Sequence, residues 1–138
     1  MTEGLDGLRE RLKEYYDLGA RFTKWRAVYK ISDRFPTSQS IKSNAHALAR
    51  YAALVQECGM VPIVEPEVLM EGDHSAKVCY EKTSEVLKKC FEELIINNID
   101  LTGIILKPNM ILDGDSAINK IDGEQVAQLT LKIGRAHV

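Results

Sequence analysis

Five charged residues stand at or near the ends of apolar segments that are typical of β-strands. They are Lys24, Arg26, Glu65, Glu67 and Lys107. Lys24 and Glu65 are 41 residues apart, and Glu65 and Lys107 are 42 residues apart. Where helices connect parallel strands, active sites lie at the C-terminal ends of the strands. We therefore predict that the five side chains meet in one site, although mutual ion pairing is the alternative role for each charge taken alone.

Lys107 is the candidate nucleophile of this site. It ends the apolar run 103–106 and precedes Pro108, which favours an extended backbone. We expect its amine to emerge from an apolar wall, where desolvation and a neighbouring cation such as Lys24 disfavour the ammonium form. A neutral lysine can attack a carbonyl carbon to form a Schiff base. Glu65 is the candidate that delivers protons as water leaves the carbinolamine.

The apolar pattern of the chain predicts seven elements in which helices and strands alternate. They are a helix over 5–18, a strand over 22–31, a helix from 38 that ends by 59, a strand from 61 that ends near 65, a helix from 74 to 96, a strand over 103–107 and a helix over 122–131. Asp73 is the predicted N-cap of the third helix. Strict alternation indicates right-handed βαβ units, so the predicted fold class is α/β with a parallel sheet.

Composition narrows the function classes. The 138 residues are 45% hydrophobic and 28% charged, which excludes collagen-like and disordered chains. The net charge of -2 without a block of like charges argues against nucleic-acid binding. No apolar run is long enough to cross a membrane, and the start of the chain lacks the features of a signal peptide. We therefore expect an intracellular protein with no membrane partner.

Other reactive residue types have structural interpretations. Cys58, Cys79 and Cys90 form no Cys-x-x-Cys pair and are predicted to be reduced helix residues. His46 and His74 lack metal-ligand spacing, so we expect capping or surface roles for them and no metal site. Trp25 is predicted to pack against the helical layer.

Several motifs, in order and at a consistent spacing, carry a family resemblance. They are TEGLDGL at 2–8, TKWRAV at 23–28, NAHALARYA at 44–52, PIVEPE at 62–67, GDH at 72–74 and LKPNM at 106–110. Together they closely resemble class I fructose-bisphosphate aldolase, and the resemblance covers most of residues 2–131.

The resemblance implies a role for each of the five residues. Lys107 matches the Schiff-base lysine that attacks the C2 ketone of fructose 1,6-bisphosphate, and no cofactor is needed. The iminium accepts the electron pair of the broken C3–C4 bond, so that glyceraldehyde 3-phosphate leaves and dihydroxyacetone phosphate follows by hydrolysis. Glu65 matches the acid/base glutamate, Glu67 a neighbour that positions the lysines, Lys24 a lysine that supports charged intermediates, and Arg26 a phosphate-binding arginine.

The family fold implied is a (β/α)8 TIM barrel, of which three strands are visible, resembling the third to the fifth. We therefore expect residues 1–132 to be part of a barrel, inactive alone, from a cytoplasmic enzyme of glycolysis and gluconeogenesis that is a homotetramer at full length. Residues 133–138 depart from the family and are predicted to be a non-native tail. Two alternatives stay open: a non-catalytic α/β interaction fragment, and another Schiff-base lyase of sugar phosphates.

Overall fold

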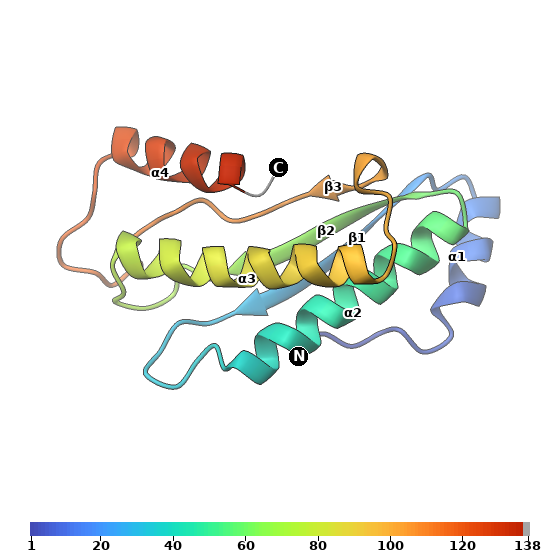
Figure 1. The fold of residues 1–138 in the computed structure, drawn as a ribbon, viewed down its shortest axis with the longest axis horizontal. Coiled ribbons are helices and arrows are strands. Elements are labelled where there is room, and N and C mark those ends of the chain that lie inside the picture. The colour runs from blue at the N-terminus through green and yellow to red at the C-terminus, as the bar shows by residue number, and fades with distance from the viewer. Residues whose placement is uncertain (137–138) are drawn as a thin grey trace.

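Three parallel strands form the sheet of the computed structural model, which describes residues 1–136 (Figure 1). They are β1 (Phe22–Tyr29), β2 (Val61–Val68) and β3 (Ile105–Leu106), in the spatial order β1-β2-β3. β1 pairs with β2 along its whole length, whereas β3 pairs only with Ile63 and Val64 of β2. The predicted α/β class with a parallel sheet is confirmed.

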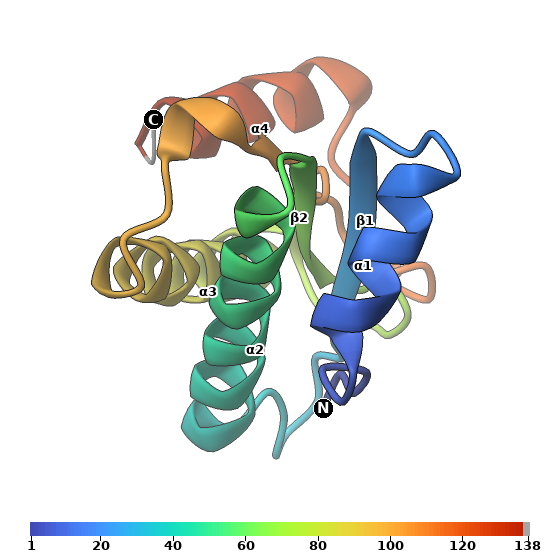
Figure 2. The ribbon, with the colours of Figure 1, turned by 90° about the vertical axis from the view of Figure 1, so that its right-hand side faces the viewer.

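Four α-helices accompany the strands: α1 (Leu8–Asp17), α2 (Ser38–Glu57), α3 (Ala76–Ile96) and α4 (Gly123–Ala136). A 3-10 turn, η1 (Leu101–Gly103), precedes β3. α2 packs against β1 and β2, and α3 packs against α2 and β2. Figure 2 shows α1 beside β1 and α2, and α4 at the far end of the molecule. The helices therefore cover one face of the sheet, and alternate strand residues point away from them.

The core lies between that covered face and the helices. Val64 of β2 and Leu48, Val55 and Leu94 of the helices are fully buried. Trp25 packs its ring against Tyr51 at 5.1 Å between centroids, so its predicted place under the helical layer is confirmed. Burial of such apolar side chains is the main contribution to the stability of the sheet and its helices.

The start of α3 differs from the prediction. Ser75, not Asp73, is the N-cap, and its hydroxyl accepts a hydrogen bond from the Val78 N–H. His74 is 8% exposed, so the expected surface role is wrong for this residue. Serine and aspartate are both good caps, and the prediction overlooked the serine two residues after Asp73.

β2 extends to Val68, three residues beyond the predicted end near Glu65. The N–H groups of Val61 and Leu69 donate to the carbonyls of Arg21, just before β1, and Tyr29, at its end, so odd positions of β2 face β1 and even positions face β3. Pro62 and Pro66 occupy even positions just outside the two residues that pair with β3. Their missing N–H groups therefore interrupt no pairing with β1, and proline is tolerated inside this central strand.

The C-terminal helix also runs further than predicted. α4 continues past Leu131 to Ala136, and Ile133 is 1% exposed within a second apolar cluster that includes Leu87 and Ile111. The expected end of the helix at about residue 131 is therefore wrong. Residues 137 and 138 of the predicted tail lie outside the described residues, and the non-native origin of 133–138 stays a prediction.

The three cysteines are free thiols. Cys79 and Cys90 are both buried on α3, and burial raises the pKa of Cys90 to about 12. Such a thiol stays protonated near neutral pH and is a poor nucleophile.

None of the helices within residues 1–136 combines the length and the apolar composition that a membrane span requires.

Candidate active site

Glu65 stands at the centre of the candidate site. Its carboxylate is 2% exposed, on the sheet face that points away from the helices. The Lys107 Nζ lies 2.5 Å from Oε1, and the Lys24 Nζ lies 2.9 Å from Oε2. The structure therefore brings together the predicted nucleophile, the predicted acid/base group and one supporting lysine.

The electrostatic balance at Glu65 favours its charged form. Burial is the largest single effect and opposes ionisation, but contacts with the Lys107 and Lys24 ammonium groups outweigh it together. The pKa of Glu65 is therefore held below its ordinary value. In the resting site Glu65 is a carboxylate shared by two cations.

Lys107 is more exposed than predicted. Its side chain is 56% exposed, and Lys24 is 51% exposed. The expectation that the Lys107 amine emerges from an apolar wall is wrong for the described residues, because more than half of the side chain is exposed and its amine contacts the Glu65 carboxylate. The catalytic roles expected from the resemblance stay predictions.

Arg26 and Glu67 form a second pair beside the first. The Arg26 Nε lies 2.5 Å from the Glu67 Oε2. The hydrogen bond and the charge of Glu67 raise the pKa of Arg26 above its ordinary value. In the described residues Glu67 therefore pairs with Arg26, and no ion pair joins it to Lys24 or Lys107.

Strand register places these charges. Arg26 is opposite Glu65 in the pairing of β1 with β2, and Leu106 is opposite Val64 in the pairing of β2 with β3. The Lys107 N–H continues the second ladder by donating to the Val64 carbonyl at 2.9 Å. Side chains two residues apart on one strand share a face, so cations from β1 and from the end of β3 flank the carboxylates of β2.

Asn109 is a residue of the site region to which sequence reasoning gave no role. Its Oδ1 accepts from the Val68 N–H at 2.9 Å, and its Nδ2 donates to the Thr83 hydroxyl at 3.0 Å. The available signal was its place in the LKPNM motif, two residues after Lys107. Its contacts join the ends of β2 and β3 to α3.

Asp113 also escaped the sequence analysis. Its Oδ2 accepts from the Ile121 N–H and its Oδ1 from the Ala76 N–H, at 2.8 and 2.6 Å. These backbone donors hold the pKa of Asp113 below its ordinary value. Because its partners are backbone amides of α3 and of the loop before α4, we assign it a structural role.

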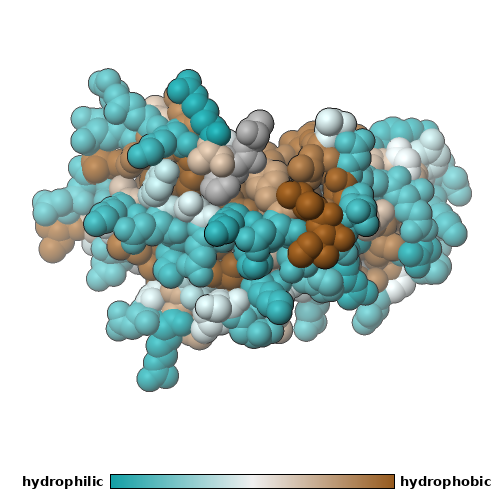
Figure 3. Space-filling view, in the orientation of Figure 1, coloured by the Kyte–Doolittle hydropathy of each residue, from teal (hydrophilic) through white to brown (hydrophobic). Residues whose placement is uncertain are grey.

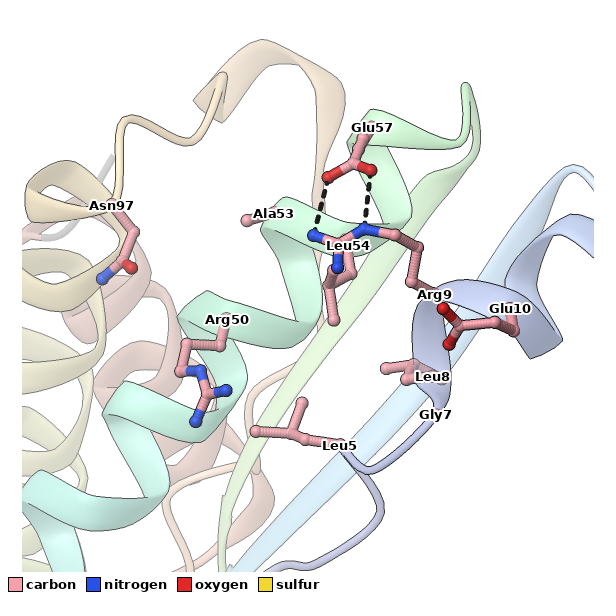
Figure 4. A pocket seen from close by; sticks show the side chains of 10 residues that line it. All are labelled: Leu5, Gly7, Leu8, Arg9, Glu10, Arg50, Ala53, Leu54, Glu57 and Asn97. Carbon is pink, nitrogen blue, oxygen red and sulfur yellow. Dashed lines mark hydrogen bonds and ion pairs between the residues drawn. The ribbon is translucent and has the colours of Figure 1, made fainter.

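Two hollows of the surface lie away from the five charges. One, of about 310 Å³, lies between α1 and α2, where the Arg9 guanidinium donates to both oxygens of Glu57 (Figure 4). Another, of about 590 Å³, is lined by apolar side chains of α3 and β3 such as Phe91, Ile95 and Leu106. It corresponds to the brown patch over β3, η1 and the end of α3 in Figure 3. Neither hollow contains a member of the charged site.

A smaller hollow, of about 240 Å³, adjoins the site itself. Lys107, Glu67 and Asn109 contribute to its wall. Among residues 1–136, no group of three His, Cys, Asp or Glu side chains is arranged to hold a metal ion. The five charged side chains of the site are two amines, two carboxylates and a guanidinium.

Comparison with known proteins identifies the family. The family model for fructose-bisphosphate aldolase class-I matches residues 1–138. A probable fructose-bisphosphate aldolase class 1 of Xanthomonas campestris is 53% identical over 131 residues, which are 95% of this chain and 39% of the relative. The cytosolic fructose-bisphosphate aldolase 4 of Arabidopsis thaliana is 47% identical over 131 residues, 95% of this chain and 33% of the relative.

A solved structure of the same family also matches the chain. Fructose-bisphosphate aldolase from Plasmodium falciparum, in complex with TRAP and a small-molecule inhibitor, matches with a TM-score of 0.96 at 46% identity over 99% of this chain and 40% of that one. The chain thus spans well under half the length of the proteins that it matches. The expected fold, three strands of a TIM barrel with their helices, is confirmed. The chain belongs to the class I fructose-bisphosphate aldolase family.

Proposed function

We propose that these residues are part of an enzyme that reversibly cleaves fructose 1,6-bisphosphate into dihydroxyacetone phosphate and glyceraldehyde 3-phosphate through a Schiff base on Lys107. The observation that carries the proposal is the buried carboxylate of Glu65 in contact with Lys107 and Lys24. An amine nucleophile and a proton carrier in direct contact are what imine chemistry requires.

The Lys107 amine must lose a proton before it attacks the C2 carbonyl. Glu65 can take that proton across the 2.5 Å contact and then deliver it to the carbinolamine oxygen, which leaves as water. The iminium that results accepts the electron pair of the C3–C4 bond while the C4 hydroxyl gives up its proton, which the Glu65 carboxylate, ionised again once water has left, can accept. Glyceraldehyde 3-phosphate then departs and an enamine of dihydroxyacetone phosphate remains. Protonation of the enamine and hydrolysis return Lys107 to its amine.

The charges around Glu65 suit an anionic substrate. Three cations and two carboxylates leave an excess of one positive charge on this face of the sheet. Lys24 stabilises charged intermediates beside Glu65, and Arg26 binds a substrate phosphate through its guanidinium fork. Glu67 orients Arg26 in the described residues, and we propose that it helps to position the lysines.

The family likeness also supports proposals about cofactor, pathway, localisation and oligomeric state. We propose a cofactor-independent enzyme of glycolysis and gluconeogenesis, cytoplasmic like the plant relative named cytosolic. The full-length chain would form a homotetramer and bind neither nucleic acid nor membranes. These proposals depend on the family likeness, and the charged site supports the reaction itself.

Substrate-dependent trapping tests the proposal. Borohydride added with fructose 1,6-bisphosphate to the full chain that carries these residues should reduce the imine and leave a substrate-derived mass on the Lys107 peptide. Lys107→Arg should abolish the adduct, whereas Lys77→Arg, at a side chain that is 85% exposed outside the site, should leave it unchanged. An adduct on another lysine, or none, would refute the assignment.

Substrate comparison separates this reaction from that of other Schiff-base lyases. The bisphosphate should be cleaved with a higher kcat/KM than the corresponding monophosphate, because Arg26 contributes a phosphate contact. A preference for the monophosphate would favour a different sugar-phosphate lyase.

A further inference from the structure

The ladder between β2 and the segment that carries Lys107 is interrupted. The Lys107 N–H donates to the Val64 carbonyl. The next bond of a regular parallel ladder would come from the N–H of residue 66. Residue 66 is a proline and has no N–H. The regular main-chain ladder therefore stops beside the candidate nucleophile.

The side chain of Asn109 bridges this gap. Its Oδ1 accepts from the Val68 N–H, where a regular ladder would use a backbone carbonyl. Its Nδ2 donates to the Thr83 hydroxyl and to the Met110 carbonyl, each at 3.0 Å. Thr83 belongs to α3 and is fully buried. Asn109 thus ties the segment after β3 both to the end of β2 and to a rigid helix.

Both members of the Lys107–Glu65 pair are close to this bridge along the chain. Lys107 precedes Asn109 by two residues, with Pro108 restricting the backbone between them. Glu65 precedes Val68 by three residues on a paired strand. A shift of the bridge therefore moves the Lys107 backbone relative to the Glu65 carboxylate.

We propose that Asn109, held in place by Thr83, is a positioning residue that sets the Lys107 amine against the Glu65 carboxylate; the catalytic part of this inference rests on the proposed function. A carboxamide suits the role because it accepts and donates hydrogen bonds at once. The Met110 carbonyl can only accept and the Val68 N–H can only donate, so these two partners fix which end of the amide faces Val68, and Thr83 adds a further bond that ties the amide to α3.

Threonine variants of the full chain test the proposal with little change of volume. Thr83→Val removes the hydroxyl, and Thr83→Ser restores it. Misplacement of a reacting group by about 1 Å can cost roughly 100-fold in rate. We expect Thr83→Val to lower kcat by about 10- to 100-fold with KM changed by less than about threefold, and Thr83→Ser to recover most of that loss.

Thr130→Val is the matched control. The Thr130 hydroxyl accepts from the Ile111 N–H at 3.0 Å and so holds the same connecting segment farther from Lys107. A general loosening of the segment would lower kcat equally in Thr130→Val and Thr83→Val. Equal losses, or a wild-type kcat in Thr83→Val, would overturn the proposal.

Lysine labelling tests the placement without any turnover. Reductive methylation with formaldehyde and cyanoborohydride, read by mass spectrometry, compares Lys107 with the exposed Lys77. We expect the Lys107-to-Lys77 labelling ratio to rise at least about threefold in Thr83→Val and Asn109→Ala, because the amine leaves the carboxylate. An unchanged ratio would overturn the positioning role. Failure of the proposed function would show separately, as wild-type protein without a substrate adduct at Lys107.

Discussion

Replacing Glu65 with glutamine tests whether the contacts with two lysines outweigh the cost of burial in the contribution of the Glu65 charge to the stability of the fold. The side chain keeps its size but loses its charge. If burial dominated, removal of the charge would stabilise the fold, as it can for buried ion pairs. The lowered pKa of Glu65 indicates the opposite, since the folded state favours the carboxylate. Glu65→Gln should therefore destabilise the protein at neutral pH.

The contacts set the size of the effect. A hydrogen bond to a charged group contributes roughly 1.5–3 kcal/mol, and Glu65 makes two contacts with ammonium groups. The glutamine carbonyl can still accept from one lysine, and both lysines are half exposed and regain water. We expect a loss of about 1–3 kcal/mol in the free energy of unfolding at pH 7.

The pH dependence provides the decisive measurement. Because the folded pKa of Glu65 lies below the ordinary value of 4.5, its stabilisation is fully present above pH 4.5 and is lost as the pH falls through the folded pKa. Urea midpoints of wild type and Glu65→Gln should therefore differ at pH 7 and converge as the pH falls below 4.5. Equal midpoints at pH 7, or a deficit that persists in acid, would refute the electrostatic reasoning.

The exposed Arg9–Glu57 pair is the control for this experiment. Its side chains are 48% and 52% exposed, so Glu57→Gln should shift the midpoint far less than Glu65→Gln. Double-mutant cycles of Glu65→Gln with Lys24→Met and with Lys107→Met should each show a coupling of about 0.5–3 kcal/mol.

Two further predictions concern activity. Arg26→Met should raise KM for the bisphosphate by about tenfold or more, with a smaller change in kcat. The control is Arg50→Met, at an exposed residue that lines the hollow between α1 and α2, and it should leave the steady-state kinetics unchanged. Similar kinetics for the two variants would contradict the phosphate-binding role of Arg26. The 138 residues expressed alone should show no aldolase turnover, because three strands cannot close a barrel, and turnover at the rate of the full chain would contradict this.

Periodicity was sufficient to predict the helices and strands, but not where hydrogen-bond partners interrupt or extend them. The apolar face of α2 and the alternation in β1 follow directly from residue spacing. The extension of β2 through Pro66 depends on which neighbour each N–H faces, and that depends on the pairing partner. In the same way, Asp73 and Ser75 both qualify as caps, and only the packed helix selects Ser75.

In the candidate site, too, residue spacing predicted part of the arrangement, and the rest depended on contacts between elements. The types and intervals of the five charges indicated that strand ends would bring them together, and the structure does so for Lys24, Glu65 and Lys107. The exposure of Lys107 was missed because the apolar residues that precede it in sequence do not cover the end of its side chain, which is 56% exposed. Asn109 was missed because an amide that replaces a ladder carbonyl becomes recognisable only once Pro66 is seen opposite the gap.

Register explains why Glu65, and not Glu67, is the shared carboxylate. Lys24 and Arg26 each reach a glutamate two positions beyond their own register partners on β2, so β1 supplies one cation to each carboxylate. The segment after β3 places Lys107 level with Glu65, and its amine contacts that carboxylate. Burial of a carboxylate in its ionised form requires compensation by nearby charge or hydrogen bonds. Only the middle-strand position flanked by a lysine from each side receives two ammonium groups, and this is where the most buried of the five charged side chains stands.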